Sequence, residues 1–178
     1  MGTLRVGING FGRIGRTLFR LLDNHQTIDV VAINDLADVS TLAHLLKYDS
    51  IHGRFPRDIK VMGSQMIIDG HSISVSNENE PKAIDWKSLD VDVVVEATGK
   101  FKLRKELEHH LTNGAKKVIL TVPPLTDDIK MVVYGVNEHL VTDDDTILSN
   151  ASCTTNNAAP MIQVIDDLCG IEQAYITT

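Results

Sequence analysis

The feature that most constrains this chain is a glycine-rich turn close to its amino terminus. Residues Gly10–Gly15 read GFGRIG, which has the spacing G-x-G-x-x-G. An apolar run at 4–9 precedes the turn, and apolar residues recur at helical spacing over 13–22 after it. A second apolar run, rich in β-branched residues, covers 28–34. The order strand, glycine turn, helix, strand predicts a β-α-β unit with two parallel strands.

This arrangement is typical of a site for the pyrophosphate group of a dinucleotide. In such a site, Gly10 makes the tight turn, Gly12 lets the backbone approach the pyrophosphate, and Gly15 allows the helix to pack closely on the strand. The amino terminus of the helix also offers free N–H groups and the positive end of its dipole to phosphates. The alternative is a glycine-rich turn that binds no ligand.

Asp35 supplies the second half of the pattern. It ends the second strand, 20 residues after Gly15, where a carboxylate hydrogen-bonds the hydroxyls of the adenosine ribose. A carboxylate there repels a 2′-phosphate and Leu36 offers no basic replacement, so NAD is favoured over NADP. The alternative role for Asp35 is a helix or turn cap. Because ligands lie at the carboxyl ends of such strands, 97–99 and Thr121 are further candidates, although turn chemistry explains Thr121 equally well.

The rest of the chain alternates buried-strand and helical patterns. This predicts an α/β fold of the Rossmann type, with a mostly parallel, doubly wound sheet. Within 53–75, three strand-like runs and the hairpin signal Asp69-Gly70 predict a small antiparallel excursion from that sheet. Further strands are expected at 91–97, 118–122, 131–134, 146–148 and 174–178, and further helices at 39–46, 102–112 and 154–168.

Composition limits the classes of partner. A net charge of −7 and a pI near 5.4 argue against nucleic acid or an anionic membrane surface, because both favour a positively charged face. No apolar run approaches the roughly 20 residues that a membrane helix needs. The two cysteines are too few for a disulfide framework and fit a reducing compartment. We therefore expect a cytoplasmic protein.

A second candidate site surrounds Cys153, which precedes the predicted helix at 154–168. Free N–H groups and the helix dipole stabilise a thiolate at such a position, and the same groups can hold a developing oxyanion. The alternative is that Cys153 is a small buried side chain flanked by hydroxyl caps. Cys169 lies late in the same helix, beside Leu168, and is expected to be buried in the core.

A cysteine nucleophile needs a base, which is usually a histidine. The chain has seven histidines, and none of them follows Cys153. His109 and His110 lie on the charged segment 102–112 and are expected to be solvated. No pair of histidines has the spacing of metal ligands, so no metal is expected. The pattern therefore provides a nucleophile without its base.

Taken together, these residues resemble the glyceraldehyde-3-phosphate dehydrogenase family. The matching segments are VGINGFGRIGR at 6–16, VVAINDL at 30–36, KYDSIHGRF at 47–55, EATGKF at 96–101, YGVN at 134–137 and SNASCTTN at 149–156. SNASCTTN is highly specific to this family and its close relatives. The resemblance implies an NAD-binding domain at 1–150 and the start of a catalytic domain, truncated, at 151–178.

The resemblance also implies an activity, the NAD-dependent phosphorylating oxidation of glyceraldehyde 3-phosphate to 1,3-bisphosphoglycerate in glycolysis. Cys153 would attack the aldehyde of the triose phosphate, a hydride would pass to NAD, and inorganic phosphate would cleave the resulting thioester. Ser152 and Thr154 would contact the substrate. From the glycine pattern and the resemblance together, the expected cofactor contacts are Gly10, Phe11, Gly12, Arg13, Ile14, Asn34, Asp35, Thr98, Gly99 and Thr121.

In this family the catalytic histidine follows a Thr-Thr pair after one intervening residue, and the chain stops on Thr177-Thr178. We therefore expect a parent enzyme that continues beyond 178 and forms a homotetramer, and a 178-residue chain that is inactive alone. The stretch at 44–55 is also similar to erythrose-4-phosphate dehydrogenase, and a non-catalytic NAD-binding module is the remaining alternative. Asn79 stands where many members of the family carry a basic residue near the adenine, and Asn157 stands where they have a second cysteine.

Overall fold

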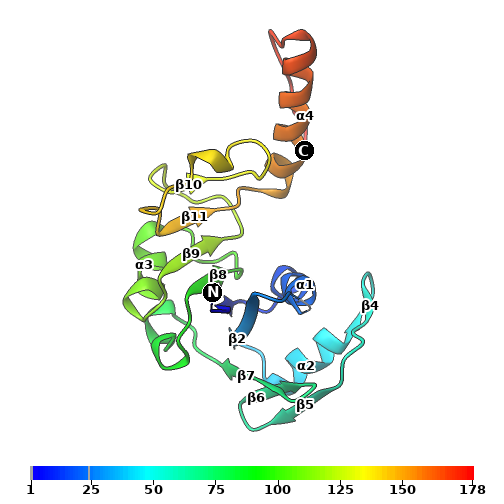
Figure 1. Ribbon diagram of the computed structural model, residues 1–178, viewed down its shortest axis with the longest axis vertical. Helices are drawn as coiled ribbons and strands as arrows, with labels where there is room; N and C mark the ends of the chain where they lie inside the picture. Colours follow the sequence, from blue (N-terminus) through cyan, green and yellow to red (C-terminus); the bar gives the residue numbers. More distant parts are fainter. Residues whose placement is uncertain (1, 24) are drawn as a thin grey trace.

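The computed structural model describes residues 2–23 and 25–178; residues 1 and 24, both inside the predicted domain at 1–150, lie outside that description. Within the described chain, nine strands form one sheet in the order β10-β11-β9-β8-β1-β2-β7-β6-β5 (Figure 1). Neighbours from β10 to β7 run parallel, whereas β7, β6 and β5 alternate in direction. The predicted α/β class with a mostly parallel sheet is confirmed.

The first β-α-β unit forms as the sequence predicted. Strands β1 (Leu4–Asn9) and β2 (Ile28–Asn34) pair in parallel on either side of helix α1 (Arg13–Leu22) in the chain. Phe19 belongs to the core cluster between the helix and the sheet, and its buried ring lies edge-on to that of Phe11 in the glycine loop, with centroids 5.7 Å apart. Ile14 and Leu21, two of the apolar residues that recur at helical spacing over 13–22, are 58% and 73% exposed, so not all of that pattern faces the core.

Helix α2 (Val39–Lys47) covers the same face of the sheet. Its first turn is capped by Asp38, whose side chain accepts a hydrogen bond from the Thr41 amide at 2.9 Å, as a capping role requires. Leu42 and Leu46 are almost fully buried against the strands. A short antiparallel pair, β3 (Tyr48–Asp49) and β4 (Gly53–Arg54), follows the helix.

The predicted antiparallel excursion comprises β5 (Ile59–Met62), β6 (Gln65–Ile68) and β7 (His71–Ser76). Asp69 and Gly70 both adopt positive φ, 48° and 91°, which is the conformation that a two-residue hairpin turn needs. However, β7 pairs in parallel with β2, so these strands extend the edge of the main sheet rather than leave it.

The chain then crosses to the other side of β1. Strand β8 (Val93–Glu96) pairs with β1 on the edge opposite β2, followed by α3 (Arg104–Thr112) and β9 (Lys117–Leu120). The turns η1 (Pro81–Ala83) and η2 (Lys87–Leu89) lie between β7 and β8. Val95 packs with the core beneath α1 and α2, and Val94 packs with the core around Trp86, so both faces of the sheet are covered.

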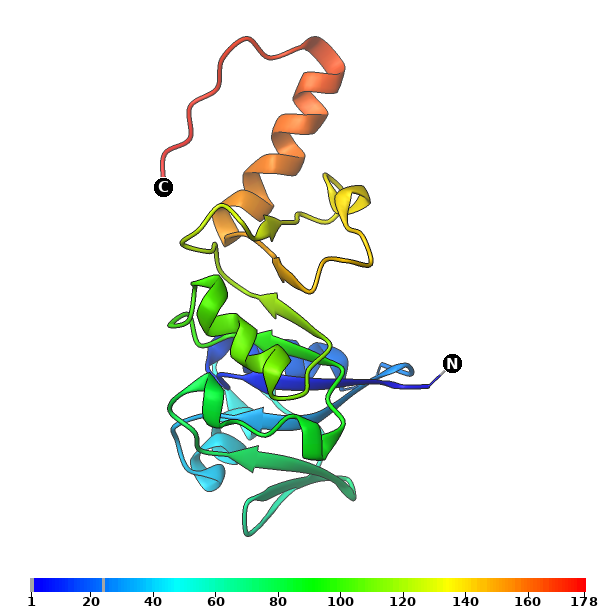
Figure 2. The same cartoon turned by 90° about the vertical axis from the view of Figure 1, so that its left-hand side faces the viewer.

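The carboxyl-terminal part differs from the sequence prediction. Strands β10 (Lys130–Met131) and β11 (Ile147–Ser149) are short, η3 (Glu138–Leu140) lies between them, and the strand expected at 174–178 is not formed. Helix α4 (Cys153–Cys169) projects from the body (Figures 1 and 2) and buries none of its residues. A strand needs a neighbour to pair with, and within the described residues the 174–178 segment has none.

No helix in the described part of the chain combines the length and apolar character that crossing a membrane requires.

Candidate functional site

A cavity of about 290 Å³ lies where β1, β2, β7 and β8 end. The strand order reverses between β8 and β1, and ligands of doubly wound sheets bind at such a switch point. Five of the predicted cofactor residues line this cavity, together with seven others: Asn9, Gly10, Gly12, Asn34, Asp35, Leu36, Glu78, Asn79, Ala97, Thr98, Lys100 and Phe101.

The three glycines have the different environments that their predicted roles require. Gly10 has a φ of +94°, and a Cβ atom there would lie 2.6 Å from the Thr98 amide nitrogen. At Gly15 a Cβ atom would lie 2.2 Å from the Gly10 carbonyl oxygen, so only glycine lets the helix approach the loop. Around Gly12, in contrast, an added Cβ atom would meet nothing within 4 Å. Gly12 therefore leaves open the space that a pyrophosphate would occupy.

The amino terminus of α1 is suited to an anion. Gly12 is the N-cap and provides no side chain to the first-turn N–H groups, and the first turn contains no acidic residue. Arg13 and Ile14 are exposed beside it. The Phe11 ring is fully buried, so within the glycine loop only the backbone of Phe11 is accessible. Arg16 holds the loop in place through a 2.9 Å hydrogen bond from its Nη1 to the Phe11 carbonyl.

Asp35 makes the turn contacts that the sequence left open as an alternative. Its Oδ2 accepts a hydrogen bond from the Phe11 amide at 2.7 Å, and its Oδ1 accepts one from the Ala37 amide at 3.0 Å. A carboxylate oxygen has a further acceptor site beyond one such bond. The half-buried side chain on the wall of the cavity can therefore fix the glycine loop and also accept from a ribose hydroxyl.

The loop after β8 forms the facing wall. Thr98, Lys100 and Phe101 line the cavity, and Gly99 between them adopts a φ of +70°. Thr121 is not part of the lining. Its amide and its hydroxyl both donate to the Glu96 carbonyl at 3.1 Å. The structure thus brings Thr98 to the site and gives Thr121 a role in joining the ends of β8 and β9.

Sequence reasoning missed a group of buried polar residues beneath the cavity. Asn9 and Glu96 are 1% and 0% exposed. Glu78, which sequence reasoning also missed, is exposed and lines the wall beyond β7 beside Asn79. The available signal was a carboxylate ending the apolar run VVVE. His110 also belongs to this group: it is fully buried, so the expectation that it is solvated was wrong, whereas its neighbour His109 is exposed.

Cys153 is the first residue of α4 and its side chain is exposed. Ser152 is the N-cap, and its Oγ accepts a hydrogen bond from the Thr155 amide at 3.0 Å. Asn156 ties the turn together by donating from Nδ2 to the carbonyls of Asn150 and Ser152. Across the described residues, no histidine forms a hydrogen bond with Cys153. The helix terminus thus presents an accessible thiol without a base.

Cys169, at the other end of α4, is exposed, so the prediction that it is buried in the core was wrong. No residue of the helix is buried, and residues 163–169 are all exposed, so there is no core around Cys169. Nowhere in 2–23 and 25–178 do three or more histidine, cysteine or acidic side chains form a group that could hold a metal ion.

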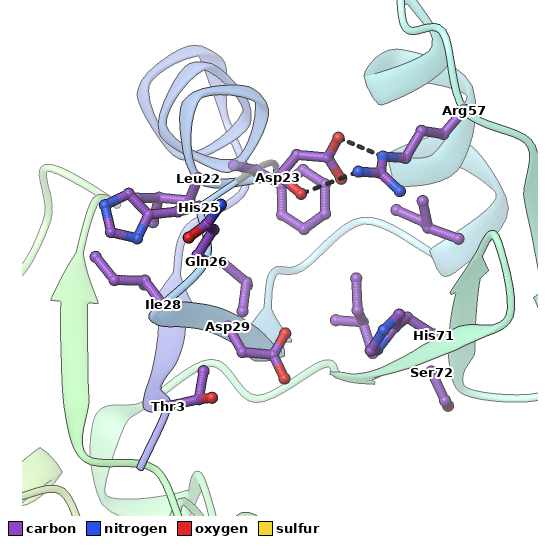
Figure 3. Close-up of a pocket in the computed structure, with 14 residues that line it drawn as sticks. Thr3, Leu22, Asp23, His25, Gln26, Ile28, Asp29, Arg57, His71 and Ser72 are labelled. Carbon is purple, nitrogen blue, oxygen red and sulfur yellow. Dashed lines mark hydrogen bonds and ion pairs between the residues drawn. The ribbon is translucent and has the colours of Figure 1, made fainter. Parts of the chain in front are cut away.

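A second cavity, of about 330 Å³, lies at the opposite end of the sheet, near the starts of β2 and β7 (Figure 3). The Asp23 carboxylate and the Arg57 guanidinium form an ion pair at 2.5 Å on its rim, with His25 and His71 nearby in the lining. It contains none of the residues predicted for a site, and its rim mixes acidic and basic groups. The candidate site therefore remains the cavity at the carboxyl ends of the strands.

A doubly wound sheet with an open glycine loop, a free helix terminus and Asp35 at its switch point defines a dinucleotide-binding domain. Residues 4–104 match the family model described as glyceraldehyde 3-phosphate dehydrogenase, NAD binding domain. The chain belongs to this family. The predicted resemblance and the choice of NAD as cofactor are thereby confirmed.

Curated relatives align with almost the whole chain. The glyceraldehyde-3-phosphate dehydrogenase of Thermotoga maritima is 48% identical over 176 residues, which are 98% of this chain and 53% of that protein. The enzyme of the same name from Geobacillus stearothermophilus is 46% identical over 98% of the chain and 52% of the relative. A cytosolic form from Trypanosoma brucei brucei is 46% identical over a similar share. The chain spans about half the length of the relatives that it matches.

Proposed function

We propose that this chain binds NAD in the cavity at the carboxyl ends of β1, β2, β7 and β8, and carries the nucleophile of a phosphorylating glyceraldehyde-3-phosphate dehydrogenase. The observation that carries the proposal is the cavity itself, in which an open Gly12, an uncapped helix terminus and the Asp35 carboxylate lie together. These groups fit a dinucleotide because each matches one part of it: backbone space and N–H groups for the pyrophosphate, and an acceptor for the ribose.

The cofactor contacts divide by part of the ligand. Gly10, Phe11, Gly12, Arg13 and Ile14 would meet the pyrophosphate from the glycine loop and the first turn of α1. Asp35 would accept from the adenosine ribose, with Asn34 beside it. Thr98 and Gly99 would form the facing wall, and Thr121 would contribute from the end of β9.

The proposed chemistry at Cys153 follows from its position as the first residue of α4. Its sulfur would attack the aldehyde carbon of glyceraldehyde 3-phosphate, while the first-turn N–H groups of the helix hold the developing oxyanion. NAD, when bound, would accept the hydride, leaving a thioester on Cys153. Inorganic phosphate would then displace the sulfur and release 1,3-bisphosphoglycerate. Ser152 and Thr154 flank the sulfur and would contact the substrate.

This reaction also needs a base, and the described residues place none beside Cys153. We therefore propose that the full-length parent, a homotetramer, is the active glycolytic enzyme, and that the 178-residue chain turns over negligibly alone. The cytosolic relative supports a cytoplasmic location. An assay of this chain with NAD, phosphate and either glyceraldehyde 3-phosphate or erythrose 4-phosphate tests the point. Turnover near an ordinary enzyme's rate, roughly 10 s⁻¹, would contradict it.

Calorimetric titration with NAD provides the direct test of the nucleotide site. Gly12→Ala should fold with a free energy of unfolding within about 1 kcal/mol of the parent, because the new methyl group meets no atom of the protein. It should nevertheless weaken NAD binding at least about tenfold, because the methyl group occupies the space for the pyrophosphate. Gly2→Ala, which is exposed and also meets nothing within 4 Å, is the matched control. Equal affinities for NAD in the unsubstituted chain, Gly12→Ala and Gly2→Ala would contradict the proposal.

A further inference from the structure

A chain of buried polar side chains runs beneath the nucleotide cavity, and the chemistry described above does not use its central members. It links Trp86, His110, Glu96, Asn9 and Asn34, all of which are 3% exposed or less. Trp86 Nε1 lies 2.9 Å from His110 Nδ1, and His110 Nε2 lies 3.1 Å from Glu96 Oε2. The chain continues from Asn9 Nδ2 to Glu96 Oε2 at 2.5 Å and from Asn34 Nδ2 to Asn9 Oδ1 at 2.8 Å.

The direction of these hydrogen bonds is fixed at the Trp86 end. An indole N–H can only donate, so His110 Nδ1 must accept and the imidazole proton must sit on Nε2. A neutral His110 in this tautomer then donates to Glu96. Trp86 itself has little freedom to move, because its ring fills the space over Gly7, where a Cβ atom would lie 2.7 Å from Cζ3.

The Glu96 carboxylate is the centre of the chain because every group that faces it is a donor. Oε2 accepts from Asn9 and His110, and Oε1 accepts from both the amide and the hydroxyl of Thr98. Thr98 Oγ1 in turn accepts from the Lys100 amide at 3.1 Å. An ionised carboxylate, which accepts only, satisfies all four donors at once.

On the Asn9 side of Glu96, the same series of hydrogen bonds positions the cavity walls beyond β1. Because Asn9 donates to Glu96, its oxygen is free to accept from Asn34 Nδ2, and this sets the orientation of the Asn34 amide. Asn34 Oδ1 then accepts from the Ser76 hydroxyl and the Glu78 amide, both at 2.8 Å, while Nδ2 donates to the Glu78 carbonyl. The loops after β7 and β8 and the ends of β1 and β2, all of which line the cavity, thus depend on one buried charge.

We infer that Glu96 is a positioning residue for NAD: its buried carboxylate, held by the tautomer that Trp86 imposes on His110, sets the hydrogen bonds that shape the cavity before the ligand arrives. This inference rests on the proposed nucleotide function. Glu96 itself does not line the cavity, so its effect on the ligand passes through Asn9, Asn34 and Thr98.

The test compares Glu96→Gln with Glu108→Gln, an exposed carboxylate on the neighbouring helix α3. Glutamine has an NH₂ group in place of one carboxylate oxygen. That NH₂ group must face either the donors from Asn9 and His110 or the two donors of Thr98. We expect Glu96→Gln to weaken binding of both NAD and ADP-ribose at least about tenfold by calorimetry, at a temperature where circular dichroism shows the variant folded. Glu108→Gln should bind as the parent does. A folded Glu96→Gln chain that binds NAD within about twofold of the parent overturns the inference and leaves only a stabilising role.

Two further measurements do not depend on Glu96→Gln folding. Nitrogen-15 NMR of the unsubstituted chain should find His110 neutral with its proton on Nε2, and a proton on Nδ1 overturns the inference. Trp86→Phe keeps an aromatic ring but removes the indole donor; we expect both tautomers of His110 and NAD binding about threefold weaker, and unchanged binding overturns the inference. If the unsubstituted chain fails to bind NAD, the proposed function fails. If the unsubstituted chain binds NAD and Glu96→Gln binds it equally well, only this inference is rejected.

Discussion

Asp35 performs two tasks with one carboxylate. It accepts from the Phe11 amide of the glycine loop and from the Ala37 amide of its own turn, so it fixes the loop before any ligand binds. It also lines the cavity, where the proposed ribose hydroxyls would reach it. A side chain with both tasks should influence affinity and cofactor choice together.

Substituting Asp35 by alanine should weaken NAD binding by about ten- to a hundredfold, because hydrogen bonds to a charged group contribute roughly 1.5–3 kcal/mol. The affinity for NADP should fall less, because the substitution also removes repulsion of the 2′-phosphate. The dissociation constant for NADP divided by that for NAD should therefore decrease. Calorimetric titration with both cofactors measures this. Asp29→Ala is the control, since Asp29 lies on β2, the strand that precedes Asp35, and lines the opposite cavity. An unchanged ratio of affinities would contradict the assignment.

His110 contributes to stability through two buried hydrogen bonds, to Trp86 and Glu96, which water does not reach. Replacing it by alanine would leave the buried Trp86 N–H without its acceptor, remove one donor from Glu96 and create a cavity. We expect the free energy of unfolding in urea to fall by about 3 kcal/mol. His109→Ala, on the exposed face of the same helix, should change it by less than about 0.5 kcal/mol. Similar losses for the two variants would show that the buried bonds contribute little.

At the scale of elements, an ion pair and hydrogen bonds from two lysines hold the segment between β10 and β11. Asp145 Oδ2 accepts from Lys130 Nζ at 2.6 Å and from the Thr142 amide at 2.7 Å. Lys117 Nζ donates to the carbonyls of Asp143 and Asp145. The Lys130 side chain and the Thr142 amide lower the pKa of Asp145 from 3.8 to about 2.

This lowered pKa predicts an acid-sensitive segment. The unfolded chain binds a proton at Asp145 near pH 4 and the folded chain near pH 2, so the contribution of Asp145 to stability is present above pH 4 and lost as the pH falls toward 2. In Asp145→Asn, the free energy of unfolding should therefore be lower above pH 4 and should depend less on pH between 2 and 4. Urea titrations at a series of pH values check this, with the exposed Asp144→Asn as control. Identical pH profiles for the two variants would refute it.

Helix α4 is capped by its own residues and is little covered by the body of the protein. Ser152 caps it and Asn156 ties down the preceding turn, but none of its side chains is buried. Most of the stability of a helix in a protein comes from tertiary packing, and α4 has little of it. The proposed catalytic residue thus lies on a helix that buries none of its residues.

At the scale of the whole molecule, this contrast predicts how the chain is digested. Brief treatment with a non-specific protease should cut first between 153 and 178 and leave a resistant core that ends near 150, because cleavage requires local unfolding. Mass spectrometry of the products locates the cuts. The boundary would match the proposed division into domains at 1–150 and 151–178. First cuts inside β1, β2 or β9 would contradict it.

The parts that the sequence predicted well are those with local causes. The positive φ at Gly10, the crowding at Gly15 and the hairpin at Asp69-Gly70 follow from which residues tolerate those conformations. Strands β1 and β2 and helix α1 follow from hydrophobic periodicity. The position of Asp35 just after β2 follows from the same pattern, whereas its contact with a ribose stays a prediction. The SNASCTTN segment gave the role of Cys153 only through its resemblance to a family, and that role stays a prediction. The structure places Cys153 as the first residue of α4, directly after the N-cap Ser152.

By itself, then, the sequence determined the β-α-β unit, the glycine loop and the choice of NAD, because these depend on neighbours within a few residues or on a recognisable motif. Only the tertiary structure decided that His110 is buried, that Cys169 is exposed and that Glu96 faces four donors. The partners of Glu96 illustrate the reason, because Asn9 lies 87 residues away in the chain and His110 lies 14. Such contacts exist only once the order of strands in the sheet has brought distant segments together.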